Sequence, residues 1–404
     1  MKLPNIDSFI KTNVILRDKS IFAKDIELYL SILNKEIEHR SVLVIGGAGT
    51  IGSSYIKAIL KFNPSKLFVV DINENGLTEL TRDLRSNPNI KVPSAYKTYP
   101  INFGDPVFYR ILQNEGPFDI VANFAAHKHV RSEKDQFSVA ALIDNNVLKA
   151  ERLLEYLRKN PPSHFFCVST DKAANPVNIM GASKKMMEEL IIAYSGEIPI
   201  TTARFANVAF SNGSLLDGFI NRLMKRQPLS VPTDVKRYFV SPEESGQICM
   251  LACMLGKSGE IFFPKFEEVQ LTSFKDITED LVNSLGMEVI PFETEQAAKE
   301  YAINMPRDTP FWPVYYFSSD TTGEKTFEEF YTTGEIIDFD RYESLGVICG
   351  SPRRLLTEIK DITARLQDVI NSEHLSKAEI VSLLTEIIPT FSHFETGKNL
   401  DQKM

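Results

Sequence analysis

The sequence predicts an α/β protein: a doubly wound parallel sheet, a smaller mixed α/β lobe, and helices at the C-terminus. From residue 41, short apolar runs alternate with amphipathic segments, which is the pattern of a parallel sheet covered by helices on both faces. After about residue 205 the alternation becomes irregular, and Pro, Ser and Asn become frequent. The 404 residues, 43% of them hydrophobic, are enough for two closely joined lobes.

The chain divides into four expected parts. Residues 1–40 form an N-terminal arm with one amphipathic helix in "FAKDIELYLSILNKEI". Residues 41–205 hold the sheet domain, which later segments rejoin; residues 206–350 form the smaller lobe, and 351–404 the C-terminal helices. Strands are predicted in "SVLVIGG", "KLFVVD", "FDIVANFAA" and "HFFCVST", and helices in "SSYIKAILKF", "ENGLTELTRDLR", "NNVLKAERLLEYLRK", "RRLLTEIKDITARLQDVI" and "SKAEIVSLLTEII".

Composition excludes several classes of protein. The net charge of −8 argues against nucleic acid or an anionic membrane as a partner. No stretch is apolar enough to predict a membrane span, and "MKLPNIDSFIKTN" lacks the layout of a secretion signal, so we expect a cytoplasmic protein. The four cysteines and six histidines show no metal-ligand spacing, so we predict free thiols and no metal site.

A glycine-rich turn lies between the first predicted strand and the helix that follows. "VLVIGGAGTIGSS" places Gly46, Gly49 and Gly52 three residues apart, with Thr50 and Ile51 among them. Glycines here permit a tight turn, allow the backbone to approach a pyrophosphate and let the helix pack on the strand. The pattern predicts a Rossmann-like dinucleotide site.

The second strand ends in Asp71, about twenty residues beyond this turn. A carboxylate there accepts hydrogen bonds from the adenosine ribose hydroxyls and repels a 2′-phosphate. NAD is therefore favoured over NADP, although Arg82 and Arg85 are near in sequence and could serve a phosphate.

Five further segments carry a family resemblance. The three-residue glycine spacing is similar to that of short-chain dehydrogenases/reductases. "NFAAHKHV", "STDKAANPVNIMGASK", "ARFANVAFSNGSL", "KRYFVSPEESGQI" and "TTGEKTFEEF" follow in the order seen in bacterial nucleotide-sugar 4,6-dehydratases of the polysaccharide-biosynthesis branch. The resemblance covers about residues 41–345 and implies a tightly bound NAD regenerated in each turnover, UDP-N-acetylglucosamine as the usual substrate, and a homo-oligomer. It places Ala125 beside the cofactor and Asn102 beside the adenine, where relatives carry Asp.

Met180 stands where this superfamily usually has a tyrosine, four residues before Lys184. In relatives the lysine binds the nicotinamide ribose and lowers the tyrosine pKa, so that the phenolate accepts a proton from the sugar. The thioether of a methionine can neither donate a proton nor usefully accept one. Two interpretations follow: an active site with different acid–base groups, or a binding protein that has lost its activity.

Thr170, Asp171 and Lys172 follow a predicted buried strand and supply the alternative groups. The resemblance implies that Lys172 removes the C5 proton and that Asp171 protonates the leaving C6 hydroxyl. These roles need a neutral lysine and a protonated aspartate, which burial favours and a close ion pair opposes. We therefore expect no tight salt bridge between them once substrate closes the site, and a coupled titration.

The sequence leaves the acceptor of the C4 hydroxyl proton open, with Thr170 as a relay or Asp171 acting first as a base. Two other functions also remain: a nucleotide-sugar epimerase, at C4 or at C5 after dehydration, and a non-catalytic NAD-binding protein. Retention of Lys172 and Asp171 favours the dehydratase, because a simple 4-epimerase needs neither group.

Substrate-binding residues are expected around the nucleotide diphosphate, because the resemblance places six polar side chains there. An arginine fork suits a pyrophosphate, and an asparagine amide can donate to a phosphate oxygen. The six residues are Lys128, Arg204, Asn207, Asn212, Ser214 and Arg237.

Overall fold

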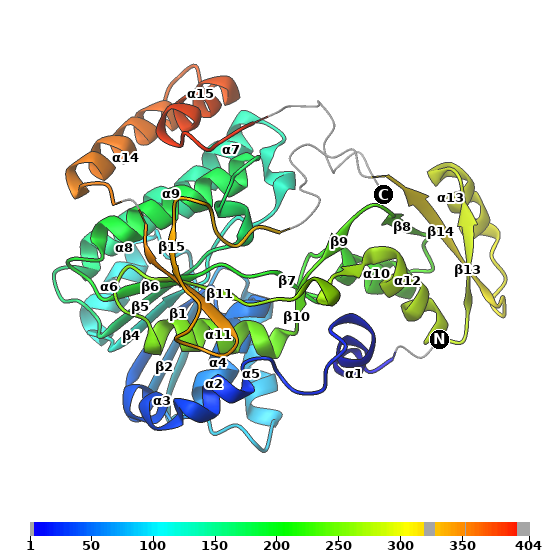
Figure 1. The fold of residues 1–404 in the computed structure, drawn as a ribbon, viewed down its shortest axis with the longest axis horizontal. Helices are drawn as coiled ribbons and strands as arrows, with labels where there is room; N and C mark the ends of the chain where they lie inside the picture. Colours follow the sequence, from blue (N-terminus) through cyan, green and yellow to red (C-terminus); the bar gives the residue numbers. More distant parts are fainter. Residues whose placement is uncertain (1–3, 319–327, 352, 394–404) are drawn as a thin grey trace.

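The computed structural model describes residues 4–318, 328–351 and 353–393, and a nine-stranded sheet lies at its centre (Figure 1). The strand order is β15-β16-β11-β6-β5-β4-β1-β2-β3, with β1 to β6 and β11 parallel and β15 and β16 antiparallel. The predicted α/β fold class is confirmed. The strands are β1 Ser41–Ile45, β2 Lys66–Asp71, β3 Ala95–Pro100, β4 Ile120–Asn123, β5 His164–Val168, β6 Ile200–Ala203, β11 Ile261–Pro264, β15 Ile336–Asp338 and β16 Leu345–Gly350.

Helices cover both faces of this sheet because its central strands are apolar on both sides. In β1, Val42 and Val44 belong to one core and Leu43 and Ile45 to the other, as strand alternation requires. The first core contains residues of α3 Leu30–Ile37, α4 Thr50–Leu60, α5 Glu74–Ser86 and α11 Pro242–Leu255; the second contains residues of α6 Pro106–Glu115, α8 Lys149–Leu157 and α9 Ile179–Tyr194.

The smaller lobe has its own core around Trp312, which is fully buried. Its three-stranded parallel sheet has the order β13-β14-β8. Two short strand pairs, β7 with β10 and β9 with β12, belong to the same half of the chain. The elements are β7 Asn207–Val208, α10 Leu215–Met224, β8 Leu229–Pro232, β9 Lys236–Arg237, β10 Phe239–Val240, η5 Glu268–Gln270, β12 Thr272–Ser273, α12 Phe274–Asn283, β13 Glu288–Phe292, α13 Glu295–Asn304 and β14 Phe311–Phe317.

The N-terminal arm from residue 4 and the C-terminal helices up to residue 393 pack onto these units. In the N-terminal arm, Phe9 and Ile10 enter the core of the smaller lobe, whereas Phe22 and Leu33 enter the core of the large sheet. Arg17 of the arm forms a salt bridge with Glu244 of α11, with 2.7 Å between Nη2 and Oε2. The C-terminal helices share a further core with α7 and α9. These elements are α1 Ile6–Phe9, η1 Ile10–Val14, α2 Ala23–Leu28, η2 Val130–Glu133, α7 Gln136–Ile143, η3 Asp144–Leu148, η4 Asp171–Ala173, α14 Leu356–Ile370 and α15 Lys377–Ile387.

Three details differ from the sequence expectations. Strand β3 was not predicted because it is a polar edge strand that ends in Pro100, where apolar alternation is weak. The single helix expected in the arm is broken at Tyr29, whose ring packs on Tyr342 and whose hydroxyl donates to the carbonyl of Arg341. The helix expected from Asn145 begins as the π-helical turn η3.

Candidate active site

A cavity of about 220 Å³ opens at the carboxyl ends of β1 and β4, where the strand order reverses. This is the place where doubly wound sheets bind ligands. Its lining includes most of the residues expected to hold a dinucleotide: Gly46, Gly49, Thr50, Ile51, Gly52, Asp71, Asn102 and Ala125.

The glycine turn is shaped so that side chains are excluded. Gly46 has φ +75°, and a Cβ there would lie 2.5 Å from the backbone N of Ala125. A Cβ on Gly52 would lie 2.3 Å from the carbonyl oxygen of Gly46. Gly49 caps the N-terminus of α4, whose free N–H groups point into the turn. The backbone thus forms a cradle open to an anionic group.

Two polar side chains that line the cavity accept hydrogen bonds from neighbouring backbone N–H groups. The carboxylate of Asp71 accepts hydrogen bonds from the N–H groups of Ala48 at 3.0 Å and Asn73 at 2.9 Å. Asn102 also lines the cavity; its side-chain oxygen accepts from the N–H of Gly104 at 2.8 Å, and its amide N–H₂ is a donor group. An accepting carboxylate and a donating amide fit an adenosine with free ribose hydroxyls.

Thr170, Asp171 and Lys172 follow β5 at the same edge of the sheet, in the 3₁₀ turn η4 and the residue before it. Thr170 Oγ1 donates to Asp171 Oδ1 at 2.7 Å, and Lys172 Nζ lies 3.2 Å from the same oxygen. The carboxylate is buried, while the lysine side chain is about one-third exposed. The expectation that this ion pair opens concerns the substrate-bound state and stays a prediction.

Helix α9 carries Met180 and Lys184. Met180 is buried among apolar side chains of α7, α14 and α15, and its backbone N–H donates to Glu133 at 2.9 Å. Lys184 is buried as well and donates to the carbonyl of Val168, at the end of β5, at 3.0 Å. Burial lowers the pKa of Lys184, and the nearby Cys167 and Glu188 oppose that shift.

Asn146, in the π-helical turn η3, fixes the loop that follows β4. Its side chain accepts from the N–H of His127 at 2.8 Å and donates to the carbonyl of the same residue at 3.0 Å. It also donates to Ser183 on α9 at 3.0 Å, so the loop and the helix are joined. π-helical turns inside helices are frequent at functional sites.

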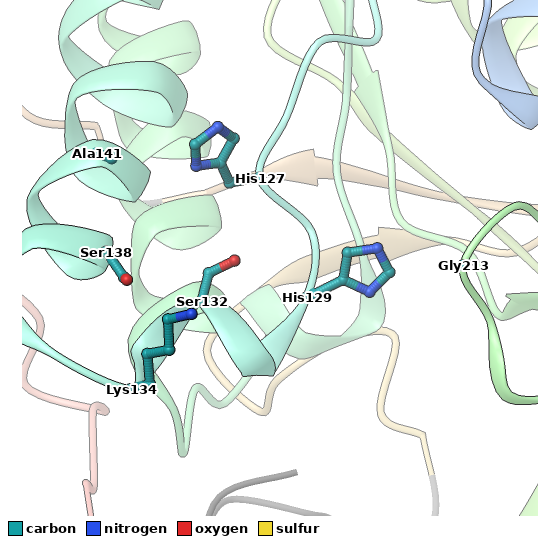
Figure 2. Close-up of a pocket in the computed structure, with 7 residues that line it drawn as sticks. All are labelled: His127, His129, Ser132, Lys134, Ser138, Ala141 and Gly213. Atoms are coloured by element: carbon teal, nitrogen blue, oxygen red, sulfur yellow. The ribbon is translucent and has the colours of Figure 1, made fainter. Parts of the chain in front are cut away.

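This loop also borders a second cavity of about 470 Å³ (Figure 2). The figure shows His127 and His129 on either side of the loop backbone, with Ser132 and Lys134 beyond them. The lining residues are His127, His129, Ser132, Lys134, Ser138, Ala141 and Gly213.

The loop at residues 211–214 reaches across to the glycine turn. The N–H of Asn212 donates to Thr50 Oγ1 at 2.9 Å, and its carbonyl accepts from Lys128 Nζ at 2.9 Å. Ser214 caps α10 by accepting from the N–H of Asp217 at 3.2 Å. Lys128 therefore lines the first cavity and Asn212 contacts two of its lining residues, whereas Ser214 caps α10.

Arg204 does not fit a substrate contact. Its side chain is fully buried, and its five N–H donors are all used: two by Glu188, two by Glu335 and one by the carbonyl of Phe330, at 2.7 to 3.0 Å. Burial disfavours the charge, but both carboxylates outweigh it and raise the pKa of Arg204. This arginine braces β6 and α9 from within.

Asn207 and Arg237 meet at a carboxyl group that the sequence expectations did not include. Asn207 Nδ2 donates to Glu328 Oε1 at 2.6 Å, and Arg237 Nε lies 3.6 Å from the same oxygen. Glu328 belongs to the motif "TTGEKTFEEF", and this motif was the feature of the sequence that could have identified it as a site residue. Residues 321–327 of that motif, including Gly323, Glu324 and Lys325, lie outside the described residues.

The pKa of Glu328 is raised to about 7. Burial is the main cause, followed by repulsion from Asp171, and the cations Arg237 and Lys172 oppose both. A carboxyl that titrates near neutral pH beside an acid–base pair is a candidate functional group.

In the described part of the chain, no cluster of three or more His, Cys, Asp or Glu side chains could hold a metal ion. None of the helices described is both long enough and apolar enough to cross a bilayer.

The sheet order, the glycine turn and the groups after β5 define an α/β protein of the epimerase/dehydratase type among the short-chain dehydrogenases/reductases. The sequence pattern of the polysaccharide biosynthesis protein family matches residues 42–306, and the chain belongs to this family.

Relatives and solved structures agree with this placement. The chain is 30% identical to an uncharacterized membrane protein of Methanocaldococcus jannaschii, over 76% of this chain and 85% of that one. It is 27% identical to the capsular polysaccharide biosynthesis protein CapD of Staphylococcus aureus, over 85% of this chain but only 55% of CapD. The structure of Pen from Bacillus thuringiensis superposes with a TM-score of 0.63 at 22% identity, covering 79% of this chain and 91% of that one. That likeness shows the shared fold.

Proposed function

We propose that this chain is an NAD-dependent nucleotide-sugar 4,6-dehydratase of polysaccharide biosynthesis, and that its substrate is UDP-N-acetylglucosamine. The observation that carries the proposal is the hydrogen-bonded group Thr170–Asp171–Lys172 at the sheet edge that also holds the glycine cradle. A dehydration needs one base and one acid beside the cofactor, and this group contains both.

The cavity residues fit NAD. The cradle at Gly46 and Gly52 suits the pyrophosphate, Asp71 the adenosine ribose, and Asn102 the adenine. NAD held by these residues would supply hydride transfer, from C4 of the sugar at the start of the reaction and back to C6 at its end.

The acid–base pair must change its charges before it can act. Transfer of one proton from Lys172 to Asp171 across their 3.2 Å contact turns the ion pair into a neutral amine and a carboxylic acid. Expulsion of water by the bound sugar favours this neutral form, because burial disfavours both charges. Lys172 then removes the C5 proton, and Asp171 protonates the departing C6 oxygen.

Nucleotide binding is proposed for Asn207 and Arg237, for Lys128 and Asn212 at the first cavity, and for Ser214 at the start of α10. Asn207 and Arg237 now contact a carboxylate, Glu328, so they already form an anion-binding pair that a phosphate could occupy. Arg204 is left out of this proposal because its donors are all engaged.

The experiment is to incubate the purified chain with UDP-N-acetylglucosamine and to weigh the product by mass spectrometry. Loss of one water molecule per sugar supports the dehydratase. An isomer of unchanged mass would identify an epimerase instead, the activity named for a relative from Rickettsia typhi that is 28% identical over 56% of this chain. Unchanged substrate would contradict both activities on this sugar.

A further inference from the structure

We propose that Arg17, in the N-terminal arm, is a positioning residue for the nucleotide of the substrate. It holds in place the segment that carries Arg237, one of the residues proposed to bind the diphosphate. The inference rests on that part of the proposed function and extends it to a residue that is far from the site in sequence. It does not depend on whether the sugar is dehydrated or epimerised.

The segment that carries Arg237 consists of β9 and β10, which are two residues long each. Among the described residues, β9 pairs with β12 and β10 with β7, and each pair forms a small sheet of its own. Asn207, the other residue proposed to bind the diphosphate beside Glu328, is paired with Phe239 of β10. A two-stranded pair is marginal in water even at greater length, so further contacts must fix the position of both residues.

The N-terminal arm supplies contacts at both ends of this segment. At β10, Arg17 Nη2 donates to the carbonyl of Phe239 at 3.0 Å. At β9 the contact is indirect: the carbonyl of Val14 accepts from Thr272 Oγ1 at 3.1 Å, and Thr272 is the pairing partner of Arg237. Arg237 therefore lies between two points that the arm holds.

Arg17 is itself fixed by a buried carboxylate. Its Nε and Nη2 donate to the two oxygens of Glu244 at 2.8 and 2.7 Å, in the paired geometry that a planar guanidinium provides. The side chain of Glu244 is 1% exposed and that of Arg17 is 14% exposed. Glu244 also completes the capping box of α11, where it accepts from the N–H of Ser241 at 2.9 Å. One guanidinium thus joins the arm, the start of α11 and strand β10.

The dinucleotide cavity is held by contacts other than those of Arg17. Helix α11 packs on α4, which follows the glycine turn, so closely that a Cβ on Gly246 would lie 2.2 Å from the carbonyl oxygen of Ser54. The two helices also share the apolar core of the large sheet. Loss of Arg17 should therefore disturb the nucleotide site of the substrate and leave the NAD site in place.

The experiment compares binding of UDP and binding of NAD to Arg17→Met by titration calorimetry. We expect the affinity for UDP to fall on the order of tenfold, as for the loss of one hydrogen bond to a charged group, and the affinity for NAD to stay unchanged. The matched control is Lys24→Met, because Lys24 lies in the same arm and pairs with Glu343 where both side chains are exposed. This control should bind both ligands as the unaltered chain does.

Two results for Arg17→Met would overturn the inference. One is an unchanged affinity for UDP. The other is an equal loss of affinity for UDP and for NAD, because Arg17 would then serve only the stability of the fold.

A second variant, Thr272→Val, covers the case in which Arg17→Met does not fold. It removes the hydrogen bond to the carbonyl of Val14 with little change in shape, and it should weaken binding of UDP but not of NAD. An unchanged affinity for UDP in that variant would then overturn the inference. If the unaltered chain bound no UDP, the nucleotide site and this inference would fail together. If it bound UDP but released no water from UDP-N-acetylglucosamine, the dehydratase alone would be contradicted.

Discussion

Two buried carboxylates seven positions apart, Glu335 and Glu328, meet arginines in opposite ways. Glu335 makes two contacts with Arg204, at 2.7 and 3.0 Å, in a cluster where each guanidinium N–H has a partner. Glu328 lies 3.6 Å from Arg237 and is repelled by Asp171. The contacts of the first cluster outweigh the cost of burial, whereas in the second cluster burial and repulsion from Asp171 raise the pKa of Glu328. The difference separates an ion pair that holds the fold from a carboxyl whose pKa is raised to about 7 by its surroundings.

The largest effect is expected from Arg204→Met, which would leave Glu188 and Glu335 buried without their cation. Such a loss costs about 3–5 kcal/mol of unfolding free energy. Urea denaturation checks it, with Arg365→Met as the control, because Arg365 pairs with Glu386 at the exposed surface and its loss should change stability little. A stable Arg204→Met variant that bound substrate poorly would contradict the structural role given to Arg204. It would support the original prediction that Arg204 is a substrate ligand.

A smaller effect on the free energy of unfolding is expected from Glu328→Gln. At high pH this substitution should stabilise the chain, whereas Arg204→Met destabilises it. The folded chain keeps the proton of Glu328 to a pKa of about 7, against an ordinary value of 4.5. The folded state therefore binds more protons between these values, and stability falls as pH rises through this window. The loss amounts to about 3 kcal/mol, and the neutral amide escapes it.

This prediction is checked by urea unfolding at about pH 5 and about pH 8. Relative to the unaltered chain, Glu328→Gln should gain stability at the higher pH and not at the lower one, while Glu329→Gln should show no such trend. An equal change in the free energy of unfolding at both pH values would mean that the pKa of Glu328 is not raised in the folded chain.

The smallest effect is expected from Met180→Leu, since the side chain is core packing near the site and not part of either cluster. A volume-conserving exchange costs less than about 1.5 kcal/mol, and turnover should persist. Met180→Tyr adds a phenol where none is needed and should lose about 1–3 kcal/mol through overpacking without any gain in rate. A faster Met180→Tyr enzyme would show that the Thr170–Asp171–Lys172 group does not fully replace the phenol.

Local patterns in the sequence predicted the sheet, the glycine turn and the Thr170–Asp171–Lys172 group, because each depends on residues close together in the chain. The two carboxylate clusters depend on distant ones. Arg204 lies beside Asn207 in sequence and so resembled a phosphate ligand, yet its partner Glu335 is 131 positions away. Glu328 stands 121 positions from Asn207. Nothing in the motif "TTGEKTFEEF" indicates that only one of its two adjacent glutamates reaches Asn207.

The most direct test follows deuterium in the sugar product by NMR after turnover of UDP-N-acetylglucosamine in D₂O. If Lys172 is the base and Asp171 the acid, the unaltered chain places one deuterium at C5. Lys172→Ala should abolish this exchange, while Asp171→Asn should keep exchange at C5 and slow the loss of water. Exchange that survives in Lys172→Ala and disappears in Asp171→Asn would contradict the roles given to these two residues.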